Sequence, residues 1–242
     1  MQLIKASNIV RQDSWKMLVY AKAGVGKTSL IRDLPGKTLV LDLDNSSRVL
    51  SGLDNVTVAS IDRSQPIEDV ASFMKQFKSW IEKGNFDNLV IDNVSSFEKD
   101  WFTEQARKSS SQLSNQIQDY SAWTNYFNRW IASALSVHIN VLITAWESTR
   151  KFVTSLGQEV NRYVPEVRDA VMDSLIGHVD VCGRMMISQK PGSEGKRFIL
   201  LEGNDNIYAK NRLDDRKAAQ PQDLFPQLKQ ADEGDNQNEN EL

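Results

Sequence analysis

The residues with the clearest chemical potential form one short segment, Ala21 to Thr28, with the sequence AKAGVGKT. It follows the pattern of a small residue, four free positions and Gly-Lys-Thr. Gly24 and Gly26 allow main-chain N–H groups to face an anion, and Lys27 supplies a positive charge. The Thr28 hydroxyl is a suitable ligand for Mg²⁺. The segment therefore predicts a phosphate-binding loop (P-loop) for Mg²⁺ and ATP or a close relative. The residues expected to bind this cofactor are Ala23, Gly24, Val25, Gly26, Lys27, Thr28 and Ser29.

The segments on either side of the P-loop have the patterns that such a loop needs. Trp15 to Ala21 (WKMLVYA) has the apolar composition of a buried strand, and Thr28 to Asp33 begins a short helix. Ala21 replaces the usual first glycine, which requires only that this residue does not adopt a positive φ. The strand, the loop and the helix thus follow in the order that phosphate binding at a helix N-terminus requires.

A carboxylate near the metal is also needed, and Asp92 is the candidate. It closes the strand Asn88-Leu89-Val90-Ile91, where a Walker B aspartate would stand. We therefore expect Thr28 and Asp92 to hold the metal. The alternative interpretation is an aspartate that caps the strand end or the next helix.

Hydrolysis requires a group that orients or deprotonates the attacking water. Asp44 is the first candidate, because it lies just beyond the apolar strand that ends in Leu43, and ligands bind at the carboxyl ends of parallel strands. Asp42 points to the opposite side of that strand and is expected to be structural. Glu147, after the strand Ile139 to Trp146, is the second candidate, as a base or as a sensor of the γ-phosphate.

Apolar runs and helical spacing define the elements that would position these residues. Strands are expected at 38–43, 55–61, 89–91 and 139–146, and helices at 66–83, 120–136 and 165–176. Their alternation predicts an α/β fold, with a mostly parallel sheet flanked by helices. A C-terminal β-hairpin is expected from 179–188 and 197–202, and polar loops are expected at 107–118 and 147–164.

The composition is that of one ordinary globular domain with an acidic end. The chain has 242 residues, of which 40% are hydrophobic and 25% charged, and a net charge of -3. Residues 232–242 contain five acidic and no basic side chains, so 29 basic and 27 acidic residues remain elsewhere. We expect a core over 1–230 and a disordered acidic tail over 231–242. A single cysteine, Cys182, and no apolar run that could form a signal peptide or cross a bilayer predict a cytoplasmic protein.

The order of these features resembles the RecA-like ATPases. It is most similar to the small single-domain versions encoded by phages, the Sak-type ATPases of single-strand annealing and recombination. The likeness covers most of residues 15–217: the P-loop, the strands that end in Asp44 and Asp92, the strand INVLITAW and the late segment YAKNRL. It implies a P-loop NTPase with a RecA-like sheet, Mg²⁺-dependent ATP hydrolysis and, for a phage protein, the host cytoplasm.

The run Lys210-Asn211-Arg212 looks like the Lys-Asn-Arg core of a motif in RadA-type proteins, where basic residues reach the nucleotide of a neighbouring subunit. The resemblance therefore implies that Lys210 and Arg212 act in trans as arginine-finger equivalents, in a homo-oligomer with ATP at the subunit interface. The Phe-Gly that follows this core in RadA proteins is absent here, so annealing or loading is favoured over strand exchange. A solvated basic turn is the alternative interpretation.

The resemblance also implies single-stranded DNA as a partner. In RecA-like proteins, the loops after the Walker B region and after the next central strand bind DNA, and 107–118 and 147–164 match them. These segments contain Arg107, Lys108, Arg150, Lys151, Arg162 and Tyr163. Basic and hydroxyl side chains favour binding to the DNA backbone without sequence preference, and a single-stranded-DNA-binding protein is a further expected partner.

Two other classes share a P-loop. The segment from Lys22 to Thr28 nearly matches the deviant Walker motif of ParA/MinD-type partition ATPases, in which Lys22 would be the signature lysine. Ala23 in place of a glycine and the residues that precede the P-loop strand argue against this class. A small-molecule kinase would need an arginine-rich lid and an acceptor pocket, and the polar segment 147–164 could be misread as such a lid.

Overall fold

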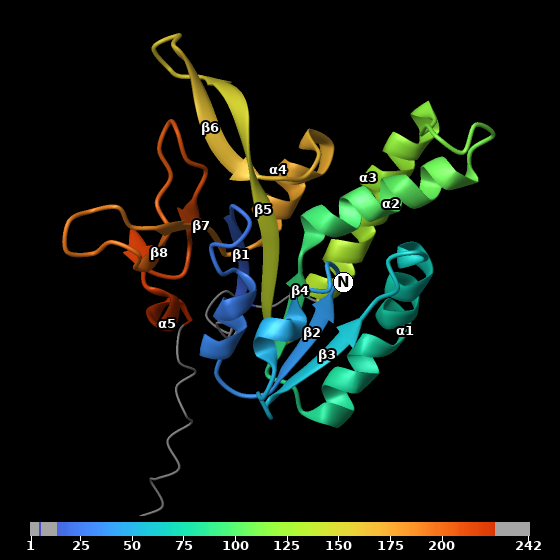
Figure 1. Cartoon of the computed structure of the whole chain (residues 1–242). Coiled ribbons are helices and arrows are strands. Elements are labelled where there is room, and N and C mark those ends of the chain that lie inside the picture. The colour runs from blue at the N-terminus through green and yellow to red at the C-terminus, as the bar shows by residue number, and fades with distance from the viewer. Residues whose placement is uncertain (1–4, 6–13, 226–242) are drawn as a thin grey trace, which may run out of the picture.

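The computed structural model describes residue 5 and residues 14–225. The fold is built on one sheet. The strand order is β10-β8-β7-β1-β5-β4-β2-β3, while β6 pairs with β5 and β9 pairs with β7 (Figure 1). The strands are β1 (Lys16–Ala21), β2 (Thr38–Asp42), β3 (Val56–Ser60), β4 (Asn88–Asp92), β5 (Asn140–Val153), β6 (Glu159–Pro165), β7 (Val181–Ile187), β8 (Arg197–Leu200), β9 (Lys210–Asn211) and β10 (Ala218–Ala219). The helices are α1 (Pro66–Gly84), α2 (Val94–Lys108), α3 (Ile117–Leu135), α4 (Asp169–His178) and α5 (Pro221–Leu224), with the 3₁₀ helices η2 (Thr28–Asp33) and η3 (Ser47–Leu50).

Six neighbouring strands, β7, β1, β5, β4, β2 and β3, run parallel. Their registers set Tyr20 beside Ala145 and Asp42 beside Asp92, so the carboxyl ends of these strands meet at one edge. Every residue of β1, β2 and β4 is buried, as expected for parallel strands covered on both faces. The sheet confirms the predicted mostly parallel α/β fold, and the antiparallel pair β7–β8 confirms the C-terminal hairpin.

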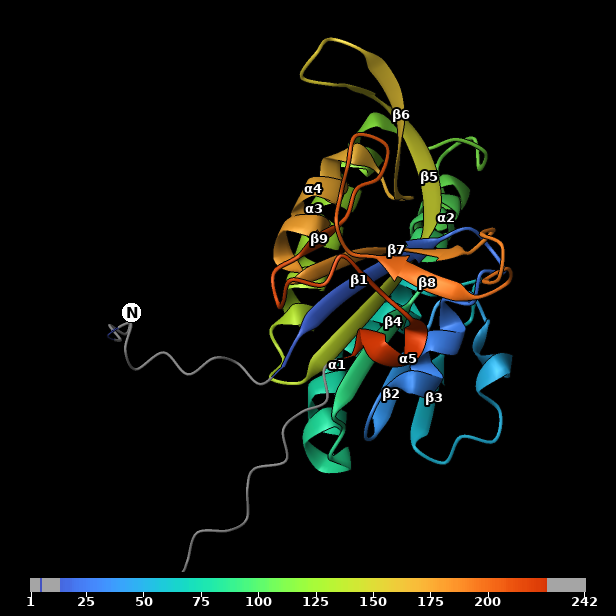
Figure 2. The ribbon, with the colours of Figure 1, turned by 90° about the vertical axis from the view of Figure 1, so that its left-hand side faces the viewer.

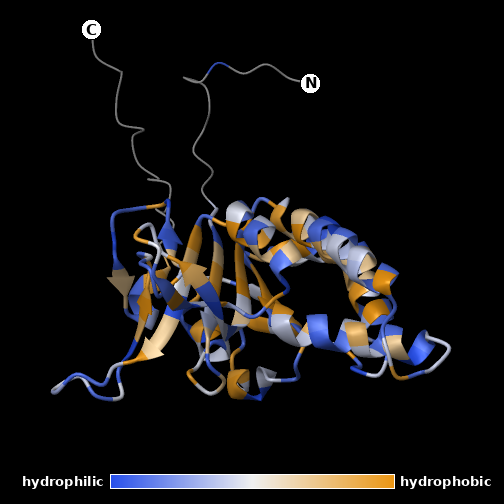
Figure 3. Cartoon of the chain, turned by 90° about the horizontal axis from the view of Figure 1, so that it is seen from above, coloured by the Kyte–Doolittle hydropathy of each residue, from blue (hydrophilic) through white to orange (hydrophobic). Residues whose placement is uncertain are grey.

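Each face of the sheet packs against its own apolar cluster. On one face, α1 to α4 contribute buried side chains such as Phe77, Phe97 and Phe127. On the other face, η2 and α5 contribute Leu30 and Leu224 (Figure 2). The apolar residues concentrate on the central strands and on the inner sides of the helices (Figure 3). The two clusters therefore hold the sheet between its helices, and the polar residues lie at the edge formed by the carboxyl ends of the parallel strands.

Local sequence signals account for where two of these helices begin and end. Pro66 lies in the first turn of α1, and Asn85 ends the helix in the left-handed region with φ of 49°. The start of α3 has a capping box, in which the Gln116 main-chain N–H donates to Asp119 over 2.7 Å. The predicted helices at 66–83 and 120–136 are thus present, and the second begins three residues earlier than expected.

Three segments differ from the sequence-based expectation. The smallest difference is in the helix expected at 165–176, because Pro165 ends β6 and α4 begins at Asp169. Residues 107–118 were expected to form a loop, but α2 continues to Lys108 and α3 begins at Ile117. The signal for α2 was present, because Asn93 caps it by accepting from the Ser96 main-chain N–H over 2.8 Å. The predicted loop is therefore confined to residues 109–116.

The expectation of an irregular loop over 147–164 was also wrong. β5 continues past the sheet to Val153 and pairs antiparallel with β6 in a long hairpin that projects from the molecule (Figure 1). Burial alternates along this part of β5, as it does in a strand with one solvated face. Because the segment is mostly polar, hydrophobicity did not show the alternation of buried and exposed residues that marks a strand.

The expected acidic tail at 231–242, and the expected end of the core at residue 230, lie outside the described residues. Within the described part of the chain, no helix is both long and apolar enough to cross a membrane.

Candidate active site

The P-loop connects the end of β1 to η2, as the sequence predicts. Gly24 and Gly26 have φ values of 79° and 110°, which side chains rarely adopt, whereas Ala21 is an ordinary strand residue. A Cβ atom at Gly26 would lie 2.8 Å from Cζ of Arg197. Glycine is therefore required at position 26 by its backbone conformation, whereas the flexible end of the Arg197 side chain could shift to make room for a Cβ atom.

Lys27 lies buried under the loop, 7% exposed. Its Nζ donates to the main-chain oxygens of Ala21 and Lys22 over 3.1 and 3.2 Å. Burial lowers the pKa of Lys27, and the nearby carboxylates of Asp92, Asp44 and Glu147 oppose this effect. A buried ammonium whose hydrogen-bond acceptors are main-chain carbonyls fits a triphosphate well, because phosphate oxygens would add charged acceptors in direct contact.

The two predicted metal ligands are in direct contact. Thr28 Oγ1 donates to Asp92 Oδ2 over 2.6 Å, and Ser46 Oγ donates to the same oxygen over 3.2 Å. The other oxygen of Asp92 accepts from the Thr144 hydroxyl of β5. A hydroxyl and a carboxylate are the oxygen donors that Mg²⁺ prefers, so Thr28 and Asp92 fit a metal that would neutralise charge on the β- and γ-phosphates.

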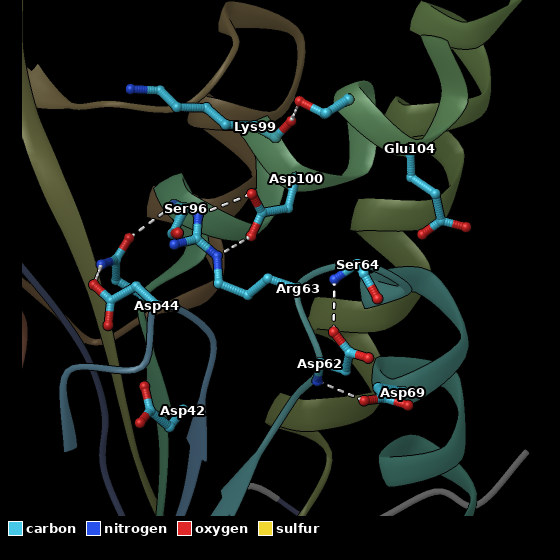
Figure 4. A network of polar contacts seen from close by, with 12 residues as sticks. Asp42, Asp44, Asp62, Arg63, Ser64, Asp69, Ser96, Lys99, Asp100 and Glu104 are labelled. Atoms are coloured by element: carbon cyan, nitrogen blue, oxygen red, sulfur yellow. Dashed lines mark hydrogen bonds and ion pairs between the residues drawn. The ribbon is translucent and has the colours of Figure 1, made fainter. Parts of the chain in front are cut away.

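Asp44, drawn in Figure 4, is half-buried and lies close enough to Asp92 for the two charges to interact. Its carboxylate accepts from the Ser46 main-chain N–H over 3.1 Å and from the Asn93 amide. Burial raises the pKa of Asp44, the hydrogen bonds from Ser46 oppose the shift, and the charges of Asp92 and Asp42 add to it. A carboxylate with a raised pKa, at the carboxyl edge of the sheet, suits a general base.

Asp42 has the structural role that the sequence predicts. It is 1% exposed, and its two oxygens accept from the main-chain N–H groups of Ser46 and Ser47, each over 3.1 Å. These bonds fix the turn after β2 that carries Asp44.

Arg63 forms an ion pair with Asp100, at a distance of 2.7 Å, on the surface next to this turn (Figure 4).

Glu147 is engaged in a buried ion pair with Arg184 of β7. Arg184 Nε and Nη2 donate to the two carboxylate oxygens over 2.7 and 3.2 Å, and the side chains of Glu147 and Arg184 are 4% and 7% exposed. Glu147 follows Trp146, the register partner of Ala21, so it lies at the phosphate edge. Both oxygens already accept hydrogen bonds, so activation of water by Glu147 would require this pair to open.

Lys210 and Arg212 are not brought to the P-loop of their own chain. β9 pairs with the beginning of β7, and Lys210 lies opposite Cys182, which is level with Leu18 of β1. Lys210 Nζ and Arg212 Nη1 both donate to the Gly177 carbonyl at the end of α4, over 3.5 and 3.4 Å. Any role of these two residues in hydrolysis would therefore act on a second copy.

The basic residues expected to bind DNA lie on the two projecting segments, and most have partners. Lys108 pairs with Glu104, Arg150 with Asp169, and Lys151 with Glu159. The Arg162 guanidinium lies 3.2 Å from the Phe152 ring centroid, which joins the two strands of the hairpin. Two exposed apolar side chains, Leu113 and Leu156, lie in the connections between α2 and α3 and between β5 and β6.

Several functional residues were missed by sequence reasoning. Ser46 and Thr144 support Asp92, and their only signal was a hydroxyl at a strand end or within an apolar strand. Beside the P-loop lies a cavity of about 640 Å³, bounded by the β7–β8 hairpin, which could hold the base and ribose of a nucleotide. Its basic lining residues are Lys22, Arg184, Lys190, Lys196 and Arg197. Only the fold brings these five together.

The geometry defines a class of protein, in which a parallel sheet carries a P-loop after one strand and a carboxylate that contacts the P-loop threonine after another. The family model described as an AAA domain (AAA_24) matches residues 13–213. The chain belongs to this family and is a P-loop ATPase. Among solved structures it is similar to a KaiC-like protein from the hyperthermophilic archaeon Pyrococcus horikoshii, with 13% identity, 77% of each chain covered and a TM-score of 0.43. The comparison with curated proteins finds no match.

Proposed function

We propose that this P-loop ATPase hydrolyses ATP with Mg²⁺ and acts on single-stranded DNA, in phage recombination, annealing or replication. The observation that carries the proposal is the continuity of β5 from Asn140 to Val153. Thr144 of this strand contacts Asp92, and the same strand forms one side of the projecting hairpin. A polymer bound at the hairpin would thus be joined to the phosphate site by one continuous strand.

The site residues support in-line hydrolysis. Asp44 would take a proton from the attacking water, whose oxygen forms a bond to the γ-phosphorus while the bond to the β–γ bridging oxygen breaks. The products are ADP and inorganic phosphate. Lys27 would neutralise charge on the outer phosphates, and the bound Mg²⁺, held through Thr28 and Asp92, would share that role.

The hairpin supports contact with a polyanion. Lys151 is 75% exposed on β5, and Arg162 lies across the Phe152 ring on the same hairpin. Cationic side chains beside an aromatic ring suit the backbone and the bases of a single strand without sequence preference. The trans action of Lys210 and Arg212 in a homo-oligomer, and a single-stranded-DNA-binding protein as partner, belong to the same proposal.

The test is ATP turnover with and without a single-stranded oligonucleotide, together with the oligonucleotide affinity at several salt concentrations. We expect stimulation by the oligonucleotide and a linear fall of log affinity with log salt. In Lys151→Ala, the salt slope should become shallower by about 0.7 for the lost phosphate contact. Lys75→Ala, an exposed lysine on α1, is the matched control and should behave as wild type. An ATPase that neither binds nor responds to the oligonucleotide would overturn the DNA assignment.

A further inference from the structure

The ion pair between Arg184 and Glu147 lies between two regions of the molecule, the phosphate edge of the sheet and the base of the β5–β6 hairpin. A buried ion pair gains little net stability, since both charges lose hydration, so stability alone does not account for this pair. Glu147 lies at the phosphate edge, close enough to Lys27 for its charge to act on that ammonium. Arg184 also lines the cavity beside the P-loop.

The other side of Arg184 contacts the base of the hairpin. Its guanidinium lies 3.5 Å from the ring centroid of Tyr163 on β6. The Tyr163 carbonyl accepts from the Tyr20 hydroxyl over 3.0 Å and from the Tyr208 main-chain N–H over 3.0 Å. Tyr163 thus ties the hairpin to β1, and β1 leads directly into the P-loop. One guanidinium therefore contacts both the carboxylate at the phosphate edge and the element proposed to hold DNA.

A bound triphosphate would bring several negative charges next to this pair. They would repel the Glu147 carboxylate and attract the Arg184 guanidinium, which already lines the neighbouring cavity. Any movement of Arg184 toward the nucleotide would weaken its contact with the Tyr163 ring, because cation–π attraction requires the cation to lie over the ring face. Binding of nucleotide would then change the affinity of the hairpin for DNA.

We propose that Arg184 is a positioning residue that couples the nucleotide site to the β5–β6 hairpin, by exchanging Glu147 for the bound nucleotide. The inference rests on the proposed function, since the hairpin must bind single-stranded DNA for the coupling to be measured. The coupling is reciprocal: nucleotide changes the affinity for DNA by the same factor by which DNA changes the affinity for nucleotide. Typical factors are about 5- to 150-fold.

The experiment measures the affinity for a fluorescent single-stranded oligonucleotide with and without a non-hydrolysable ATP analogue and Mg²⁺, in wild type and two variants. Arg184→Lys keeps the charge but loses the two-pronged donor to Glu147. Tyr163→Leu keeps the ion pair but removes the ring. We expect the change in DNA affinity caused by nucleotide to fall to about twofold or less in both variants, compared with a typical coupling of fivefold or more in wild type. Arg129→Lys, an exposed arginine on α3, should retain the wild-type factor.

If Arg184→Lys does not fold, Tyr163→Leu still measures the coupling factor, because it removes the contact between Arg184 and the hairpin. A wild-type coupling factor that persists in a folded variant of either residue overturns the role of Arg184 and leaves the proposed function intact. A wild-type protein that binds the oligonucleotide equally with and without nucleotide also overturns it. Failure of wild type to bind the oligonucleotide at all overturns the proposed function together with this inference.

Discussion

At the scale of single residues, Asp92, the proposed metal ligand, is supported by a neighbour from another strand. The Thr144 hydroxyl donates to the Asp92 oxygen that Thr28 does not use. We expect Thr144→Val, which keeps the shape but removes the hydroxyl, to reduce turnover by about 10- to 100-fold, as for other residues that orient metal ligands. Steady-state kinetics at varied Mg²⁺ would check this. Unchanged kinetics would show that Asp92 needs no such support.

Cys182 provides a second test at this scale. Its thiol is fully buried in the sheet, and burial raises its pKa to about 12. The native thiol therefore stays protonated at pH values where an unfolded cysteine, with a pKa of about 8.5, has ionised. We expect slow labelling by a thiol reagent at pH 8, at the rate of unfolding, and a stability that decreases as the pH rises from about 9 toward 12. Rapid labelling of the native protein would contradict this burial.

The P-loop and the contact between Thr28 and Asp92 could be predicted, because each residue type is recognisable from its own short segment of sequence. The structure places Lys27 under the P-loop and brings Thr28 into contact with Asp92. Arg184 and Arg197 could not be predicted, because each reaches the site from a strand far along the sequence. Only the strand order sets such residues beside a P-loop.

At the scale of elements, the β7–β8 hairpin carries Arg184 and bounds the cavity. Gly183 lies in β7, where an added Cβ would collide with Ile199 of β8. We expect Gly183→Ala to destabilise the protein by about 1–3 kcal/mol through overpacking. Gly177→Ala in α4 is the matched control: a Cβ there meets nothing within 4 Å, and alanine should stabilise the helix by about 0.5–1 kcal/mol. Chemical denaturation of both variants would test this, and equal stabilities would contradict it.

Most elements could be predicted from apolar periodicity, and the two larger errors have a physical cause. β5 changes from a fully buried strand to a strand with one solvated face at about Trp146, so the apolar run stops while the strand continues. In α2, buried Phe97 and Trp101 pack against α3 between polar residues, a weaker pattern than that of α1. In α2 and in the outer part of β5, the local composition is ambiguous, and tertiary packing determines the secondary structure.

At the scale of the whole molecule, Lys210 and Arg212 lie away from the P-loop of their own chain. Trans action in a homo-oligomer predicts that Arg212→Ala still binds nucleotide but loses turnover. Mixing Arg212→Ala with Lys27→Ala should restore part of the activity, because one chain supplies an intact P-loop and the other supplies the arginine. Unchanged turnover in Arg212→Ala, or no recovery on mixing, would remove the trans role.

The central claim is that Lys27, buried beneath main-chain carbonyls of the P-loop, binds the outer phosphates, whereas Lys22 is exposed at the rim of the cavity. The most direct measurement compares Mg²⁺-dependent ATP turnover in Lys27→Ala and Lys22→Ala. We expect Lys27→Ala to lose turnover completely, and Lys22→Ala to retain it within about fivefold, since an exposed charge contributes little. The reverse result, with Lys22 essential and Lys27 dispensable, would contradict this account and favour a partition-type ATPase.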